Sequence, residues 1–120
     1  MSTVQGETPT DQLRAICLAL PEASEKEAWG DPTWRIRDKI FAMEKRGDGR
    51  ISVWCKAPPG SQEILVESAP ALYFVPPYVG HKGWVGMRLD AKPDWDEAAM
   101  LIKRSYSLIA PKPLARQIDD

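Results

Sequence analysis

Residues 73–89 read Tyr-Phe-Val-Pro-Pro-Tyr-Val-Gly-His-Lys-Gly-Trp-Val-Gly-Met-Arg-Leu, and no other part of the chain is as constrained. Pro76 and Pro77 fix two successive φ angles and remove two backbone donors, so a strand that begins at Tyr73 has to end there. From Trp84 to Leu89 apolar positions alternate again, which predicts a second strand with one apolar face. The residues between the two strands therefore form a stiff, shaped loop.

Loops of defined shape on a rigid scaffold often carry binding sites. Aromatic side chains with a few polar groups are the usual lining of a small-molecule pocket. The alternative is that the loop covers a sheet edge and that its aromatic residues pack in the core. If a pocket forms, the side chains expected to line it are Tyr73, Tyr78, His81, Lys82, Trp84 and Arg88.

The composition is that of one globular domain. The chain has 120 residues, 43% of them hydrophobic and 28% charged, with a formal net charge of −1. A domain that binds duplex DNA is usually more basic, so the total charge argues against that class. Cys17 and Cys55 lack the spacing of a metal or redox motif and are expected to be buried thiols in a reducing compartment.

We expect a cytoplasmic monomer that does not associate with membranes. Residues 1–12 are polar and do not resemble a signal peptide, and no apolar run is long enough to span a bilayer. We predict a single domain over residues 1–120, with an ordered core at about 9–114 and polar tails at both ends.

The chain alternates between short strands and helices. Helices are predicted after Thr8, from Gln62 to Ser68 with Ile64 and Leu65 buried, and after Asp94. Strands are predicted at 22–30, 33–37, 39–45, 50–56, 73–75 and 84–89, with a turn at Gly30-Asp31-Pro32 and a hairpin at Arg46–Gly49. This order predicts an α+β fold with a mostly antiparallel sheet and N-terminal and C-terminal helices packed on it.

Several stretches resemble the MmcQ/YjbR-like family. They include Val75-Pro-Pro-Tyr-Val-Gly80 followed by Gly83-Trp84, together with Leu13–Pro21 and the run that begins at Trp29-Gly-Asp-Pro. The resemblance extends from about Leu13 to Leu114. It implies a compact α+β domain with a double-wing motif and a role in DNA binding, and it supplies no catalytic residues.

Charge is distributed unevenly along the chain. Residues 34–56 contain seven basic and three acidic side chains, which predicts a basic β-hairpin that binds nucleic acid phosphates weakly and in a salt-dependent way. Trp34 and Trp54 would stack on unpaired bases if they were exposed. Alternatively, these cations only keep strand edges solvated. The candidate phosphate-binding residues are Arg35, Arg37, Lys39, Lys45, Arg46, Arg50 and Lys82.

No catalytic or cofactor motif is recognisable in the sequence. His81 is the only histidine and has no neighbouring nucleophile, and there is no phosphate loop, dinucleotide fingerprint or metal-binding cluster. We therefore predict a non-catalytic domain without cofactor or metal; the alternative is an enzyme whose acid and base carboxylates come together only on folding. Its partner is either DNA or, through the loop after Pro76, a small anionic ligand or a peptide.

Overall fold

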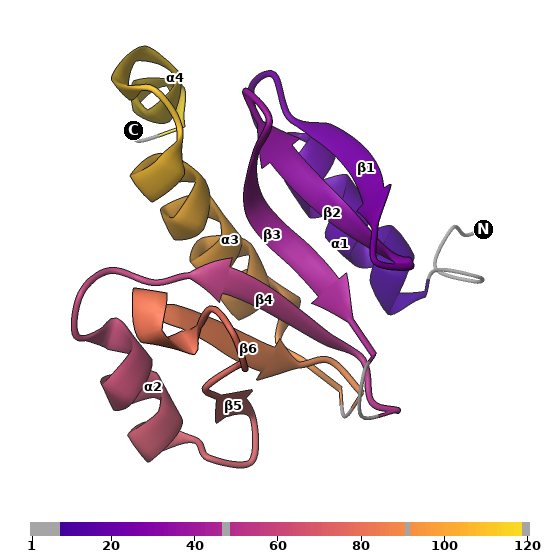
Figure 1. Ribbon diagram of the computed structural model, residues 1–120, viewed down its shortest axis with the longest axis vertical. Helices are drawn as coiled ribbons and strands as arrows, with labels where there is room; N and C mark the ends of the chain where they lie inside the picture. The colour runs from indigo at the N-terminus through magenta and orange to yellow at the C-terminus, as the bar shows by residue number, and fades with distance from the viewer. Residues whose placement is uncertain (1–7, 47–48, 91, 119–120) are drawn as a thin grey trace.

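The computed structural model describes residues 8–46, 49–90 and 92–118, and it is an α+β fold as predicted (Figure 1). A six-stranded sheet has the order β1-β2-β3-β4-β6-β5, and all neighbouring strands in it are antiparallel. The strands are β1 Ser24–Ala28, β2 Asp31–Ile36, β3 Lys39–Lys45, β4 Ser52–Lys56, β5 Tyr73–Phe74 and β6 Trp84–Arg88. The helices are α1 Pro9–Leu18, α2 Ser61–Ser68, α3 Trp95–Ile109 and α4 Lys112–Gln117, with a short 3-10 helix η1 at Gly80–Lys82.

The helix starts follow the capping residues in the sequence. Thr8 accepts a hydrogen bond from the backbone of Asp11, whose carboxylate accepts one from the Thr8 backbone, so α1 begins with a capping box. Asp94 accepts from the backbone of Asp96 and Glu97 and starts α3 in the predicted place. Both caps satisfy backbone donors that the first helical turn leaves without partners.

The hydrophobic core lies between the sheet and helices α1 and α3, which pack on the same face (Figure 1). Trp34, Phe41 and Tyr106 are its largest fully buried aromatic side chains. Phe41 and Ala42 are adjacent in β3, yet both are buried in this core, because a register shift between β2 and β3 places them opposite one partner position. The alternation predicted for residues 84–89 is confirmed, since Val85, Met87 and Leu89 enter the same core.

Some predicted details were wrong. The ordered core was expected to end at about residue 114 and a polar tail to follow, but residues 112–117 form helix α4, which buries Leu114 in the core. Ile64 and Leu65 were both expected to be buried; Leu65 packs on the core, but Ile64 is 66% exposed. The turn expected at Gly30-Asp31-Pro32 lies one residue earlier, at Trp29-Gly30, so that Asp31 already belongs to β2.

Gly47 and Asp48 of the predicted hairpin turn lie outside the described residues, as do residues 1–7 and 119–120 of the predicted tails. Strands β3 and β4, on either side of that turn, pair antiparallel as a hairpin requires. Within the described part of the chain, no helix has both the length and the apolar character needed to cross a membrane.

Candidate functional site

The face of the sheet opposite α1 and α3 carries two rows of side chains that run across the strands. In the first row Met43 pairs with Trp54, which pairs with Gly86, which in turn pairs with Phe74. Gly86 leaves room for an aromatic ring, since a Cβ there would lie 2.2 Å from Cζ of Phe74. The first row is therefore an apolar floor made of two aromatic rings and a methionine.

The second row is polar and is adjacent to the first. Lys45 pairs with Ser52, and Ser52 pairs with Arg88. The guanidinium of Arg88 lies 4.5 Å from the ring centroid of Phe74, and Nζ of Lys45 lies 5.0 Å and 5.7 Å from the ring centroids of Trp29 and Trp54. Both cations thus lie over aromatic faces, which is a favourable electrostatic arrangement.

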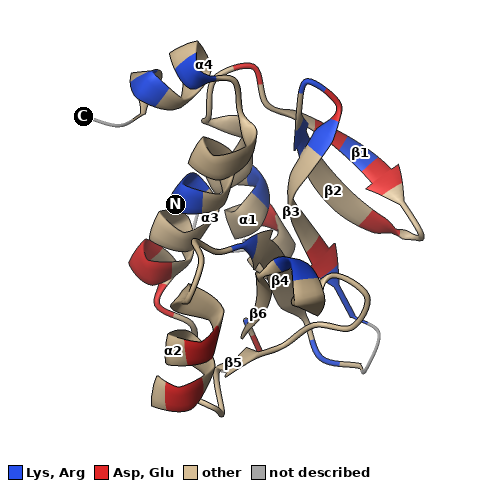
Figure 2. Ribbon diagram, turned by 60° about the vertical axis from the view of Figure 1, so that its left-hand side comes forward, with Lys and Arg blue, Asp and Glu red and all other residues tan. Residues whose placement is uncertain are grey.

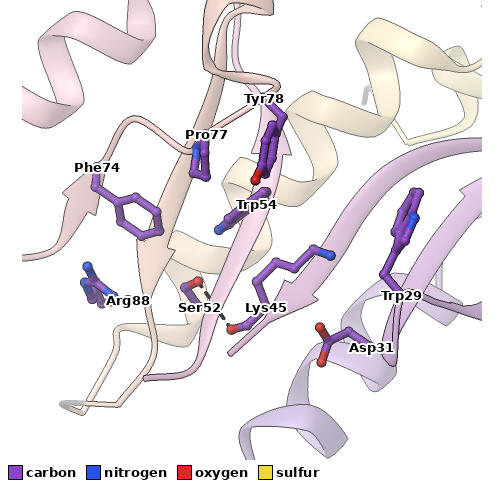
Figure 3. Close-up of a pocket in the computed structure, with 9 residues that line it drawn as sticks. All are labelled: Trp29, Asp31, Lys45, Ser52, Trp54, Phe74, Pro77, Tyr78 and Arg88. Carbon is purple, nitrogen blue, oxygen red and sulfur yellow. Dashed lines mark hydrogen bonds between the residues drawn. The ribbon is translucent and has the colours of Figure 1, made fainter. Parts of the chain in front are cut away.

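Two exposed aromatic side chains rise on opposite sides of this floor (Figure 3). Trp29 is 74% exposed in the turn between β1 and β2, and Tyr78 is 87% exposed in the loop after Pro77. Both have positive φ angles, 56° and 69°, which bulky residues rarely adopt. Their exposed rings form the two rims of a candidate site.

The rims and the two rows enclose an open pocket with a volume of about 590 Å³, within the usual range for small-molecule sites. A second hollow of about 510 Å³ shares Trp29, Lys45, Trp54 and Tyr78 with it and extends over Met43 and Val79. The larger pocket is lined by Trp29, Asp31, Lys45, Ser52, Trp54, Phe74, Pro77, Tyr78 and Arg88.

The floor of the pocket contains a hydrogen-bond donor without a partner. Trp54 is 9% exposed, and its indole N–H has no acceptor among the described residues. Buried donors are nearly always paired, and an unpaired one calls for an explanation. The indole nitrogen is itself buried beneath the surface of the floor, so this donor is a feature of the protein interior and not of the pocket surface.

The structure separates the residues that the sequence suggested for a pocket. Tyr78 and Arg88 line it. Tyr73 lies in the core on the opposite face, and Trp84 packs beside Met43 and Trp54 without lining the pocket. His81 and Lys82 are exposed on η1, away from the lining.

Sequence reasoning missed Trp29, Asp31, Ser52 and Phe74, and it considered Trp54 only as a base-stacking residue. Ser52 and Trp54 could have been found, because they share the strand face opposite the apolar Val53 and Cys55. Trp29 and Asp31 carried no such signal, since their place depends on the exact position of the β1–β2 turn.

Most residues proposed to bind nucleic acid already have partners within the protein. Four arginines form ion pairs: Arg35 with Asp38, Arg37 with Glu22, Arg46 with Glu44 and Arg50 with Asp90. The hydrogen bond from Arg37 lowers the pKa of Glu22, and the one from Arg50 lowers the pKa of Asp90. Lys39 and Lys82 are exposed, and Lys45 belongs to the pocket.

These cations are also divided between two ends of the sheet. Arg37 and Lys39 lie at the β2–β3 turn, whereas Arg46 and Arg50 lie at the β3–β4 end, about 20 Å away along seven-residue β3. Acidic segments occur beside the basic ones on β1 and β3 (Figure 2). Trp34 is fully buried and donates its indole N–H to Glu25, so it is not available for stacking.

The two thiols are not functional groups of an exposed site. Burial raises the pKa of Cys55 to about 12 and raises that of Cys17 still further. Both stay protonated at neutral pH and pack as small core residues. Within residues 8–46, 49–90 and 92–118, no cluster of three or more His, Cys, Asp or Glu side chains could hold a metal ion.

Comparison with known proteins gives the family. A search of curated proteins found no match. Among solved structures, the fold resembles the crystal structure of the Deinococcus radiodurans protein DR2400, described as a DUF419 domain. The TM-score is 0.75 at 20% sequence identity, over 94% of this chain and 88% of that one. The YjbR family profile matches residues 18–108, most of the sheet and its helices. The chain is therefore a member of the YjbR family.

Proposed function

We propose that the protein is a binding module whose site is the aromatic pocket, and that its ligand is flat and anionic. The observation that carries this proposal is Lys45, whose ammonium group lies between the rings of Trp29 and Trp54 (Figure 3). The rings offer a stacking surface, and the ammonium group offers an anion partner at the same place.

Arg88 adds a second cation at the far end of the pocket, next to Phe74. A guanidinium group can donate two parallel hydrogen bonds to a carboxylate or phosphate, which favours anions with two or more oxygens. The ring of Trp54 adds apolar stacking surface to the pocket beside Lys45.

The test uses two ligands that differ only in charge, indole-3-acetate and indole-3-acetamide. Binding is followed by NMR of the backbone amides and the indole N–H groups of the ¹⁵N-labelled protein. We expect saturable shifts at Trp29, Trp54, Ser52 and Arg88, with the acetate binding several-fold tighter than the amide. Equal affinity for the two ligands would show that the pocket does not select an anion. Shifts confined to other surfaces would show that the pocket is not the binding site.

Nucleic-acid binding through the basic hairpin is a second candidate function. The observation that favours it is the exposure of Arg37, Lys39, Arg46, Arg50 and Lys82. Each arginine would have to exchange its carboxylate partner for a phosphate, which predicts weak, salt-dependent binding.

This candidate is tested by the salt dependence of binding to a short random duplex. Replacing one phosphate-contacting residue, as in Arg50→Ala, should flatten the slope of log K against log salt by about one unit. If each single-residue variant keeps the wild-type slope, the hairpin is not the surface that contacts the phosphates.

A further inference from the structure

The pocket contains an acidic side chain that a simple anion does not explain. Asp31 lines the pocket two residues after Trp29, at the start of β2 (Figure 3). Within the part of the chain that the structure describes, its carboxylate forms no hydrogen bond or ion pair. An ionised carboxylate is negatively charged, so it repels an anion. It also accepts hydrogen bonds, so it binds a ligand edge that carries N–H donors.

The three chemical features of the pocket occur in a fixed order. The acceptor Asp31 is beside the Trp29 rim, the aromatic floor and Ser52 are in the middle, and Arg88 is at the other end. A matching ligand presents a donor edge, then a flat ring, and then a group with several anionic oxygens. An amino-bearing nucleobase with its phosphate has this order.

We propose that the pocket binds an unpaired nucleotide whose base carries an exocyclic amino group. The base stacks against Trp29 and directs its amino group to Asp31, while the phosphate binds Arg88. The hydroxyl of Ser52 donates to the carbonyl oxygen of Lys45 at 3.5 Å, a long hydrogen bond that it would exchange for one to the phosphate. This inference rests on the proposed function, because it uses the same pocket and specifies its ligand. Base-paired nucleotides are excluded, since pairing occupies the amino group and stacking occupies both ring faces.

The side chain of Lys45 has to change its position when the base binds. Its ammonium group lies 5.0 Å from the ring centroid of Trp29, the surface on which the base would stack. A base that enters displaces the ammonium group from the indoles, and the long lysine side chain can follow the phosphate instead. The ammonium group of Lys45, which lies beside Trp29 in the unbound protein, thereby binds the phosphate of the nucleotide.

The discriminating experiment compares AMP with purine riboside 5′-monophosphate, which lacks only the amino group. Affinities are measured by NMR titration of the whole labelled protein. We expect AMP to bind at least about tenfold tighter, the equivalent of one charged hydrogen bond. Adenosine and inorganic phosphate, each with half of the ligand, should bind more weakly than AMP.

Asp31→Ala supplies a readout that general damage to the fold would not give. The variant should lose affinity for AMP but keep or gain affinity for the purine riboside nucleotide, because it removes both the acceptor and its repulsion. Lys45→Met should weaken both nucleotides about fivefold or more, whereas the matched control Lys82→Met, outside the pocket, should leave both unchanged. Trp29→Asn should abolish stacking and still fold, because Asn-Gly is the preferred sequence of such a turn.

The outcomes distinguish the binding function of the pocket from the assignment of a nucleotide as its ligand. If indole-3-acetate binds in the pocket but AMP binds no better than purine riboside monophosphate, the nucleotide assignment is overturned and the binding function stands. If neither ligand gives shifts that depend on Trp29, both are overturned. A short oligo(dA) that binds much tighter than AMP identifies a single strand as the source of the nucleotide, and equal affinity identifies the free nucleotide.

Discussion

Ser105 is the buried hydroxyl group that joins α3 to the sheet. It donates a hydrogen bond to the carbonyl of Phe41 at 2.6 Å and accepts one from the backbone N–H of Lys56 at 2.9 Å. Phe41 lies at the register shift between β2 and β3, and Lys56 is the last residue of β4. One side chain thus satisfies two backbone groups that the sheet itself leaves without partners there.

Removing this hydroxyl should destabilise the fold. Ser105→Ala leaves one donor and one acceptor unpaired in a site that water does not reach, so we expect a loss of about 1–3 kcal/mol in the free energy of unfolding. Ser107→Ala on the same helix is the control and should change it by less than about 0.5 kcal/mol. Urea denaturation measures both, and similar values for the two variants would contradict the role given to Ser105.

Glu25 carries a pH-dependent contribution to stability. It accepts hydrogen bonds from Arg14 at 2.7 Å and 3.0 Å and from the indole of Trp34 at 3.0 Å. The bond from Arg14 is the main cause that lowers the pKa of Glu25 below its ordinary 4.5. Because the folded pKa is the lower one, the stabilisation is present above about pH 4.5 and is lost as the pH falls further.

Glu25→Gln tests this contribution, since the amide oxygen can still accept from Trp34. We expect the variant to be less stable than the wild type at pH 7 by about 0.5–1 kcal/mol, because the ion pair is partly exposed. The difference should shrink toward zero as the pH falls well below 4.5, through the lowered pKa at which the wild-type carboxylate becomes protonated. Urea denaturation at neutral and at low pH measures the free energy of unfolding of both proteins. A difference between them that does not change with pH would contradict the role given to the Glu25 carboxylate.

At the scale of elements, the two hairpins β1–β2 and β2–β3 share one kind of turn. Ala28 pairs with Asp31 across Trp29-Gly30, and Ile36 pairs with Lys39 across Arg37-Asp38. All four central residues have positive φ angles, which is the type I′ conformation that matches the twist of the strands. The first turn has the preferred Gly in its second position, and the other has Asp.

Asp38→Gly should therefore stabilise the protein. Glycine adopts the positive φ of 71° at that position without a steric penalty, so we expect a gain of about 0.5–1 kcal/mol and a rise of a few degrees in Tm. The lost ion pair with Arg35, 3.8 Å long and exposed at Asp38, contributes little. Thermal unfolding should show the opposite sign for Asp38→Ala, and a lower Tm for the glycine variant would disprove the argument.

The elements also show how far the sequence predicts this fold. Thr8 and Asp94 located two helix starts correctly, and the alternation after Trp84 gave the inward face of β6, because these signals are local. Helix α4 is short and contains Pro113, so its pattern is too brief to distinguish from a loop. The pocket needed strand register, which places Lys45, Ser52 and Arg88 side by side and which no local pattern reveals.

At the scale of the whole molecule, the centre of the sheet is packed against α3 and its first edge strand is not. Strands β3 and β4 contact α3 and have neighbours on both sides, whereas β1 is an edge strand whose first four residues are exposed. The least stable part of a domain opens first, and an edge strand with few buried side chains opens most easily.

Native-state hydrogen exchange should show this gradient. We expect the slowest amides in β3, β4 and α3, close to the rate of global unfolding, and amides of β1 exchanging at least about tenfold faster. Exchange followed by NMR resolves each strand. Equal protection of β1 and β4 would mean that the sheet opens only as one unit.

A sheet that is covered by helices on one face leaves the other face available to a second molecule. Two copies that packed pocket to pocket about a two-fold axis would bring Lys45 and Arg88 of one copy close to the same cations of the other. Like charges at close range oppose such a dimer, while the exposed rings of Trp29 and Tyr78 favour it. We therefore expect the charges of the second row to weaken self-association through this aromatic surface.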